Sequence, residues 1–103
     1  MASVKIGGFR FKIKEEDNVY SGDMKLDGDI NYPELVIRLE RSNPQIIKDL
    51  VLLHEIMHGV FTLSINREMG GDEAFIMQVA DRLYALIRDN PKMFVDIAQR
   101  KVS

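Results

Sequence analysis

Residues 42–61, SNPQIIKDLVLLHEIMHGVF, mark the point at which the hydrophobic pattern changes from a period of two to a helical period. Ser42 or Asn43 can cap a helix, and Pro44 suits its first position. Apolar side chains then recur at spacings of three and four, which is typical of a helix with one buried face. We therefore predict a mostly buried helix that starts near Pro44 and ends around residues 63–66.

The chain before this helix carries strand patterns. Apolar and charged residues alternate over residues 9–14, and Gly7-Gly8 suits a tight turn between this strand and a strand at residues 4–6. Residues 15–25 are polar and rich in turn-forming residues, so we expect a loop there.

A second hairpin is expected after that loop. Residues 28–32, GDINY, and residues 35–40, LVIRLE, flank a turn at Pro33 and Glu34. The N-terminal part, residues 1–41, is therefore predicted to form a small antiparallel sheet.

Two more helices are expected toward the C-terminus. Asp72 can cap a helix that runs to about Asp89, and Asn90-Pro91 would end that helix and begin a short third one. The apolar residues of the third helix are expected to pack back onto the rest of the protein: Met93, Phe94, Ile97 and Ala98.

The length and the order of these elements predict a single α+β domain over residues 1–103, with the sheet in 1–41 and the helices in 42–103. The content of 46% hydrophobic and 29% charged residues is that of a globular protein rather than a disordered one. Because the net charge is −2 and no basic stripe is present, a nucleic-acid partner is not expected. The N-terminal residues lack a long apolar run, which predicts a cytoplasmic protein with no membrane association.

The two histidines of the chain lie four residues apart, with Glu55 directly after the first. Positions i and i+4 are neighbours on a helix surface, so His54 and His58 would project toward one point and can share a metal ion. Glu55 is rotated by about 100° from His54, which keeps it off the metal but near a bound water, where a general base belongs. The alternative is that both histidines are packed on a core-facing helix. The combined spacing favours a zinc site.

A catalytic zinc site usually has three protein ligands and a water molecule. Since the chain has no cysteine and no third histidine, a carboxylate must complete the site: the candidates are Glu68, Asp72, Glu73 and Asp81. We prefer Glu73, because the first turn of a helix favours an anion and an antiparallel return would bring it near His58. Asp72 has a competing role as a helix cap, and Asp81 lies roughly 12 Å further along the helix. Glu73 can also be read as a surface acid that complements the helix dipole.

With His54, Glu55 and His58 on one helix and Glu73 at the start of the next, the chain resembles the gluzincins, the zinc peptidases whose third ligand is a glutamate. Its size and layout are similar to those of the minigluzincins and of small zinc-peptidase-like proteins of phages and prophages. In those proteins a glutamate-bearing helix that ends in Asn-Pro follows the motif helix, as residues 72–91 do here. The resemblance implies a minimal zincin-like fold and one zinc ion per chain, held by His54, His58 and Glu73. It also implies a metallopeptidase that hydrolyses peptide bonds through a zinc-bound water, with Glu55 as general base.

The resemblance further implies where a substrate binds. In such folds the edge strand beside the cleft pairs with an extended backbone, so residues 35–40 are the candidate docking strand for a peptide or a flexible protein segment. The same residues can equally be read as a plain core strand with a polar outer face.

Two departures from the gluzincin pattern concern the groups that support catalysis. Met77 stands where gluzincins commonly have an aspartate that supports the first histidine, so a backbone carbonyl, Gln78 or Asp81 would have to replace it. No residue is evident that would stabilise the oxyanion, because Tyr84 is too far along its helix. Tyr20 and Tyr32, on the sheet side, are the remaining candidates.

These departures leave a second class of function open, a non-catalytic zinc-binding module of regulatory or interaction type, as in phages and prophages. Glu55 distinguishes the two classes, because a purely structural zinc site needs no acid beside its first ligand. Its presence favours the peptidase.

Overall fold

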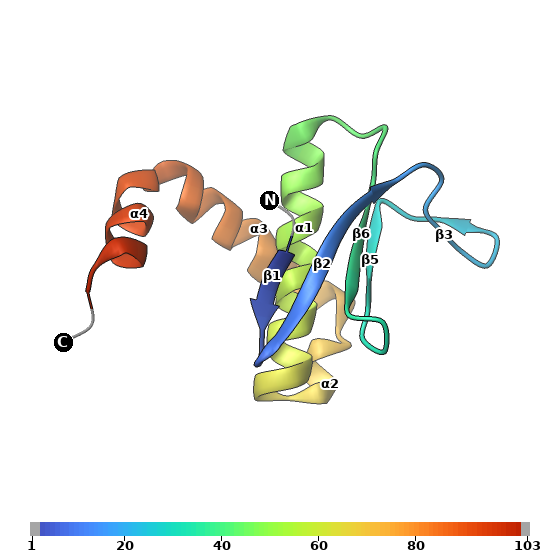
Figure 1. The fold of residues 1–103 in the computed structure, drawn as a ribbon, viewed down its shortest axis with the longest axis horizontal. Helices are drawn as coiled ribbons and strands as arrows, with labels where there is room; N and C mark the ends of the chain where they lie inside the picture. Colours follow the sequence, from blue (N-terminus) through green and yellow to red (C-terminus); the bar gives the residue numbers. More distant parts are fainter. Residues whose placement is uncertain (1–2, 102–103) are drawn as a thin grey trace.

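The strand patterns of the N-terminal part form a four-stranded mixed sheet in the computed structural model, which describes residues 3–101 (Figure 1). Its strands, in spatial order, are β1 (Ser3–Ile6), β2 (Phe9–Glu16), β6 (Val36–Glu40) and β5 (Gly28–Asn31). Both expected hairpins are confirmed, since β1 pairs with β2 and β5 pairs with β6 in antiparallel orientation. Together with the helices that follow, the sheet makes the predicted α+β domain.

The prediction of a wholly antiparallel sheet is wrong at one junction. The strands β2 and β6 run parallel, with Lys12 opposite Val36 and Glu16 opposite Glu40. The reason is that β6, rather than β5, takes the place beside β2. The strand β6 carries Ile37, which is fully buried, whereas β5 is the polar sequence GDIN and occupies the edge.

The same arrangement corrects the expectation that residues 35–40 form an edge strand. The strand β6 has a hydrogen-bonded neighbour on each side, and Leu35 lies in the preceding turn with a φ of 54°. The edges of this sheet are β1 and β5.

The prediction of a loop over residues 15–25 is wrong, because these residues include a second, two-stranded sheet. The strand β2 continues to Glu16, and β3 (Tyr20–Ser21) pairs with β4 (Met24–Lys25). This hairpin is anchored by Glu40, whose carboxylate accepts hydrogen bonds from Val19 N–H and Lys25 Nζ, both at 2.9 Å. Glu40 is only 2% exposed, and the Lys25 ammonium, together with the Val19 N–H, lowers the pKa of its carboxyl to about 2.

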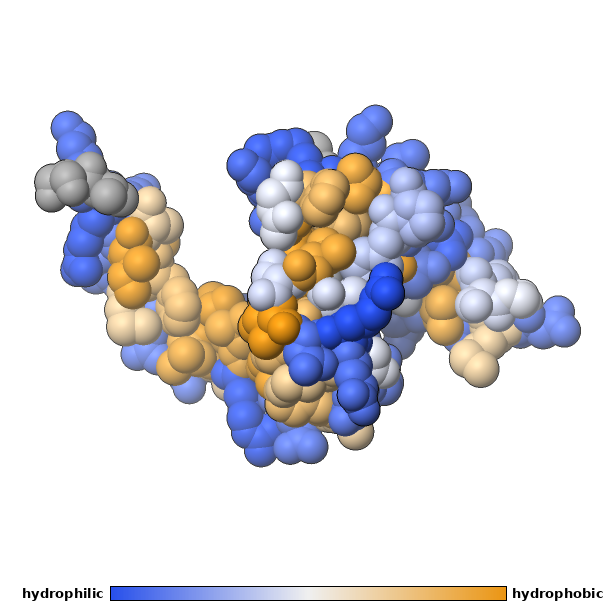
Figure 2. Space-filling view, turned by 90° about the horizontal axis from the view of Figure 1, so that it is seen from below, coloured by the Kyte–Doolittle hydropathy of each residue, from blue (hydrophilic) through white to orange (hydrophobic). Residues whose placement is uncertain are grey.

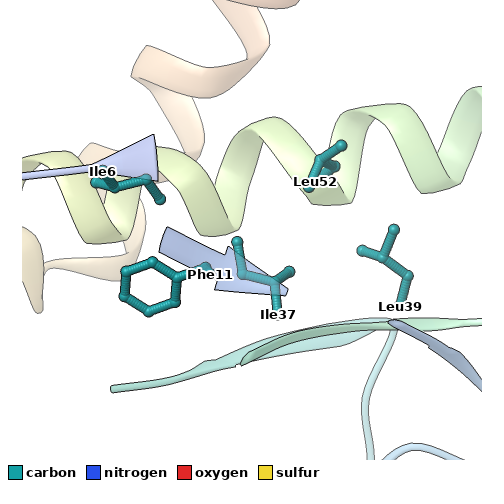
Figure 3. Close-up of a cluster of buried hydrophobic side chains, with 5 residues drawn as sticks. All are labelled: Ile6, Phe11, Ile37, Leu39 and Leu52. Carbon is teal, nitrogen blue, oxygen red and sulfur yellow. The ribbon is translucent and has the colours of Figure 1, made fainter. Parts of the chain in front are cut away.

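The helix α1 (Gln45–Val60) lies across one face of the four-stranded sheet (Figure 1). Figure 3 shows Leu52 pointing from this helix toward the strand residues of the main hydrophobic core: Ile6, Phe11, Ile37 and Leu39. The helix begins one residue later than predicted, because Pro44 occupies the N-cap position and makes no side-chain cap. The hydroxyl of Ser42, a predicted cap, donates instead to Glu40 over 3.0 Å.

A π-helical turn, η1 (Phe61–Ile65), follows α1, so the helical segment ends near the predicted residues 63–66. The connection to the next helix contains one helical turn, α2 (Arg67–Gly70), whose N-cap Asn66 accepts a hydrogen bond from Met69 N–H at 3.0 Å. The next helix, α3 (Glu73–Asp89), packs along α1. Its predicted cap is confirmed, because Asp72 accepts a hydrogen bond from Phe75 N–H at 3.1 Å.

The last helix, α4 (Pro91–Gln99), begins after Asn90 as predicted but does not pack back onto the sheet. It contacts the end of α3, and the two form an arm that leaves the body of the protein (Figure 1). Met93 and Ile97, which we expected to pack back, are 46% and 56% exposed. Figure 2 shows the resulting apolar surface along the arm. Within residues 3–101, no helix is both long and apolar enough to cross a bilayer.

Candidate metal centre

Three side chains from two helices bring their ligand atoms to one point. His54 and His58 lie one turn apart on α1, and Glu73 is the first residue of α3. The two Nε2 atoms are 3.0 Å apart, and His58 Nε2 is 3.0 Å from Glu73 Oε2. The other oxygen of Glu73 contacts His54 Nε2. All three residues can offer ligand atoms that lie within 4.8 Å of one another.

The orientation of His58 is set by a backbone carbonyl. His58 Nδ1 is 2.7 Å from the carbonyl oxygen of Gly70, which can only accept a hydrogen bond. The Nδ1 atom must therefore carry the proton, and in a neutral imidazole Nε2 keeps its lone pair for a metal ion. This carbonyl supports the second histidine of the motif.

The three ligand atoms would repel one another if nothing positive lay between them. The Nε2 atom of His58, whose proton lies on Nδ1, and the ionised carboxylate of Glu73 are acceptors, and His54 Nε2 is an acceptor in its Nδ1–H tautomer. With Glu73 ionised and His58 Nδ1–H bonded to Gly70, protons would satisfy both contacts to Glu73 only if His58 were charged and both Nε2 atoms carried a hydrogen, 3.0 Å apart. One metal ion accepts all three lone pairs at once, so the geometry favours a cation.

The donor set fits zinc. Two imidazole nitrogens and one carboxylate oxygen, with a fourth position left for water, are a typical catalytic zinc arrangement. Zinc–nitrogen bonds of about 2.0–2.1 Å at tetrahedral angles separate neighbouring ligand atoms by about 3.3 Å. The 3.0 Å separations around His58 Nε2 are close to that value. The side chain of Glu73 is 65% exposed, so the open side of this site faces solvent.

Close packing at Gly70 explains why its carbonyl reaches His58. A Cβ atom at position 70 would lie 2.5 Å from the backbone nitrogen and 2.7 Å from the Cα atom of Thr62 in the π-helical turn. Only glycine lets α2 lie this close to η1. In the sequence Gly70 is followed directly by Gly71. The glycine pair signals a special backbone position, but the neighbour it approaches depends on the π-helical turn, which the pattern does not show.

The candidate base, Glu55, is buried beside the three candidate ligands. It is 8% exposed, and this burial raises the pKa of its carboxyl to about 7, against the opposing effect of His58. The carboxylates of Glu73 and Asp29 add to the increase. Glu55 is therefore a carboxylate that can take up and release a proton near neutral pH.

Two hollows that share Glu55 adjoin this cluster and β5, and we refer to them together as the cleft. The first, of about 330 Å³, is lined by His54, Glu55 and Glu73, and by further residues: Asp27, Gly28, Leu50, Val51, Met77 and Asp81. The second, of about 390 Å³, is lined by Glu55 and His58, and by further residues: Asp29, Ile30, Tyr32, Thr62, Arg67, Gly70 and Gly71. Because β5 is an edge strand, the cleft runs along unpaired backbone.

The other ligand candidates are not part of the cluster. Asp72 caps α3, Asp81 lines the first hollow without joining the ligand group, and Glu68 lines neither hollow. Met77 also lines the first hollow.

The sequence left two supporting groups open: a hydrogen-bond partner for His54 and a residue that could stabilise the oxyanion. Within residues 3–101, His54 Nδ1 has no hydrogen-bond partner, so neither Gln78 nor Asp81 supports it. Tyr32 lines the second hollow, whereas Tyr20 and Tyr84 line neither hollow. Tyr32 is thus the tyrosine that the fold brings to the cleft.

Comparisons of the chain with protein-family models, with curated proteins and with solved structures found no match.

Proposed function

We propose that this protein is a zinc-dependent metallopeptidase that hydrolyses peptide bonds in peptides or flexible protein segments. The observation that carries the proposal is the convergence of His54, His58 and Glu73 at one point with the buried carboxyl of Glu55 beside them. Histidine–carboxylate ligation with an open position suits catalytic zinc, and a structural site would need no such acid.

The roles of the residues follow from their positions. Zinc held by His54, His58 and Glu73 would lower the pKa of a water molecule and polarise the scissile carbonyl. Glu55 accepts the proton of the attacking water and then delivers it to the nitrogen of the leaving amine as the C–N bond breaks. Burial raises the pKa of the Glu55 carboxyl to about 7 in the metal-free protein, and a bound zinc ion would favour the ionised form that accepts the proton.

The strand that binds the substrate backbone is then β5 rather than residues 35–40. The strand β5 pairs with β6 on one side only, and Gly28, Asp29 and Ile30 border the cleft. An extended peptide can add to this edge by main-chain hydrogen bonds. The side chains of the bound peptide would then lie over the two hollows.

The second candidate is a non-catalytic zinc-binding module of regulatory or interaction type. It is favoured by the position of the ligands, since His54 and His58 on α1 and Glu73 on α3 would let zinc cross-link the two helices. The missing partner of His54 Nδ1, among the residues described, also weakens the catalytic arrangement.

One experiment separates the two candidates. Bound zinc and chelator-sensitive cleavage of an unstructured protein are measured for the wild type, for Glu55→Gln and for Glu34→Gln, an exposed acid in the β5–β6 turn. The peptidase predicts about one zinc per chain in all three proteins. It also predicts cleavage by the wild type and Glu34→Gln, and loss of cleavage in Glu55→Gln. Zinc binding without cleavage by any of them would instead establish the module.

A further inference from the structure

The second hollow carries an excess of hydrogen-bond donors that the metal centre does not use. Arg67 at the start of α2, Tyr32 after β5 and Thr62 in η1 all line it. Within residues 3–101, none of these three side chains has a hydrogen-bond or ion-pair partner. A guanidinium and two hydroxyl groups are therefore free to bind a ligand in this hollow.

The acids that share the second hollow do not neutralise Arg67. Asp29 is held by Arg38, which donates to Oδ1 over 2.9 Å and also contacts Oδ2. Glu55 is only 8% exposed and forms no ion pair within residues 3–101. Arg67 is the single cationic side chain that lines the second hollow among the residues described.

The first hollow is lined by acidic side chains instead of a guanidinium. Its lining includes the carboxylates Asp27, Glu73 and Asp81, with no lysine or arginine among the residues described. The cleft is thus charged differently at its two ends, on either side of His54 and His58. A substrate that lies along β5 would meet a guanidinium on one side of the reacting bond and carboxylates on the other.

We propose that the second hollow is a specificity subsite for a carboxylate of the substrate, bound by Arg67 with help from the hydroxyls of Tyr32 and Thr62. The inference rests on the proposed peptidase function. Because Arg67 presents a planar fork of donors, it can bind a carboxylate through two parallel hydrogen bonds. The hollow shares Glu55 and His58 with the metal centre, so the carboxylate would belong to a residue next to the cleaved bond.

Two sources offer this carboxylate, an Asp or Glu side chain and the free C-terminus of a peptide. They are separated with quenched fluorescent peptides that carry Glu or Gln at each position around the cut, each with a free or an amidated C-terminus. Preference for Glu in amidated peptides assigns the subsite to a side chain. Preference for the free acid regardless of Glu assigns it to the chain end.

Arg67→Gln and Arg67→Lys test the role of the guanidinium, with Arg100→Gln as the matched control on an exposed arginine. We expect Arg67→Gln to lower kcat/KM for the preferred acidic peptide by about 10- to 100-fold, the range for a hydrogen bond to a charged group. The loss should appear mainly in KM, with little change for the Gln peptide. Arg67→Lys should recover part of it, since a lysine keeps the charge but not the fork.

Binding provides a readout that does not depend on turnover. The affinity of zinc-loaded Glu55→Gln for acidic and neutral peptides is measured by fluorescence anisotropy, with and without Arg67→Gln. A preference for the acidic peptide that disappears in Arg67→Gln supports the subsite. If this preference is seen but no variant cleaves any peptide, the peptidase proposal fails and the subsite stands. Cleavage and binding with equal preference for Glu and Gln peptides, unchanged by Arg67→Gln, would overturn the subsite and leave the peptidase standing.

Discussion

The imidazole of His58 donates its Nδ1–H to the carbonyl oxygen of Gly70 over 2.7 Å, which links the motif helix to the short helix that follows it. The bond leaves His58 Nε2 facing Glu73 and His54, the two other members of the cluster. The carbonyl can take this position because Gly70 lies against the backbone of Thr62. A close backbone contact thus fixes the orientation of a candidate metal ligand.

Gly70→Ala tests the role of this contact. The added Cβ would lie 2.5 Å from the backbone nitrogen of Thr62, so α2 must move and carry the carbonyl away from His58. We expect a loss of about 1–3 kcal/mol in unfolding free energy and about 10- to 100-fold weaker zinc binding. Urea unfolding and competition with a chelating dye measure the two effects. Gly71→Ala is the control, because its Cβ meets nothing closer than 3.7 Å. Equal behaviour of the two variants would contradict the role of Gly70.

Glu73→Ala should weaken zinc binding far more than Glu68→Ala. Glu73 contacts both histidines, whereas the side chain of Glu68 lies outside the ligand group. Removing one of three protein ligands leaves a two-histidine site with an additional open position. Loss of a residue that only supports a ligand typically weakens metal binding by about 10- to 100-fold. Loss of the ligand Glu73 itself should therefore lower the zinc affinity, measured by competition titration, by about 100-fold or more. If both variants bind as the wild type does, another carboxylate is the third ligand.

Zinc should raise the melting temperature of the protein in a concentration-dependent manner. The ligands come from α1 and α3, so the ion binds the folded chain and not the unfolded one. At free zinc of 100 times the Kd, the gain in unfolding free energy is about 2.7 kcal/mol. Calorimetric scans with zinc, with magnesium and with a chelator measure the gain, and the His54→Ala, His58→Ala double variant should show none of it. A similar shift for that variant would place the ion elsewhere.

Glu40 should make the stability of the metal-free protein depend on pH in the acidic range. Hydrogen bonds from Lys25 and Val19 lower the pKa of Glu40 to about 2, below the usual value of 4.5. A carboxyl whose folded pKa is lowered contributes its stability above pH 4.5 and loses it as pH falls from about 4.5 to about 2. Urea unfolding with a chelator present, at a series of pH values from 7 to 2, is expected to show this decline.

Glu40→Gln supplies the control for that decline. The amide keeps a similar shape but cannot pair with the Lys25 ammonium, so stability at pH 7 should fall and the acidic decline should become shallower. Glu34→Gln, at an exposed turn residue, should leave both unchanged. An acidic decline of the same size in Glu40→Gln would assign it to other carboxylates.

The elements of the fold were predictable where local chemistry determines them. Gly7-Gly8 gives the first hairpin, with φ values of 56° and 85°, and Asp72 caps α3. The order of the strands was not predictable in this way. Whether β5 or β6 lies beside β2 depends on which strand gains more from burial between neighbours, and that choice is made across the whole sheet.

In the candidate site, too, the residues set by local spacing were predictable and those set by tertiary packing were not. His54 and His58 follow from the helical spacing, and Glu73 follows from its place at the start of the next helix. The contribution of Gly70 depends on a π-helical turn, for which the periodicity gives no signal. The position of Arg67 in the cleft depends on the same turn, since Arg67 opens α2, which packs against η1.

The polar strand β5 is only four residues long, from Gly28 to Asn31. At about 3.4 Å per residue, its free edge spans about 14 Å. A chain lying along it would be held by few main-chain hydrogen bonds. Under the proposed function, a segment that pairs with this edge must be free of its own secondary structure over about four residues, so the substrates would be locally unfolded stretches of polypeptide.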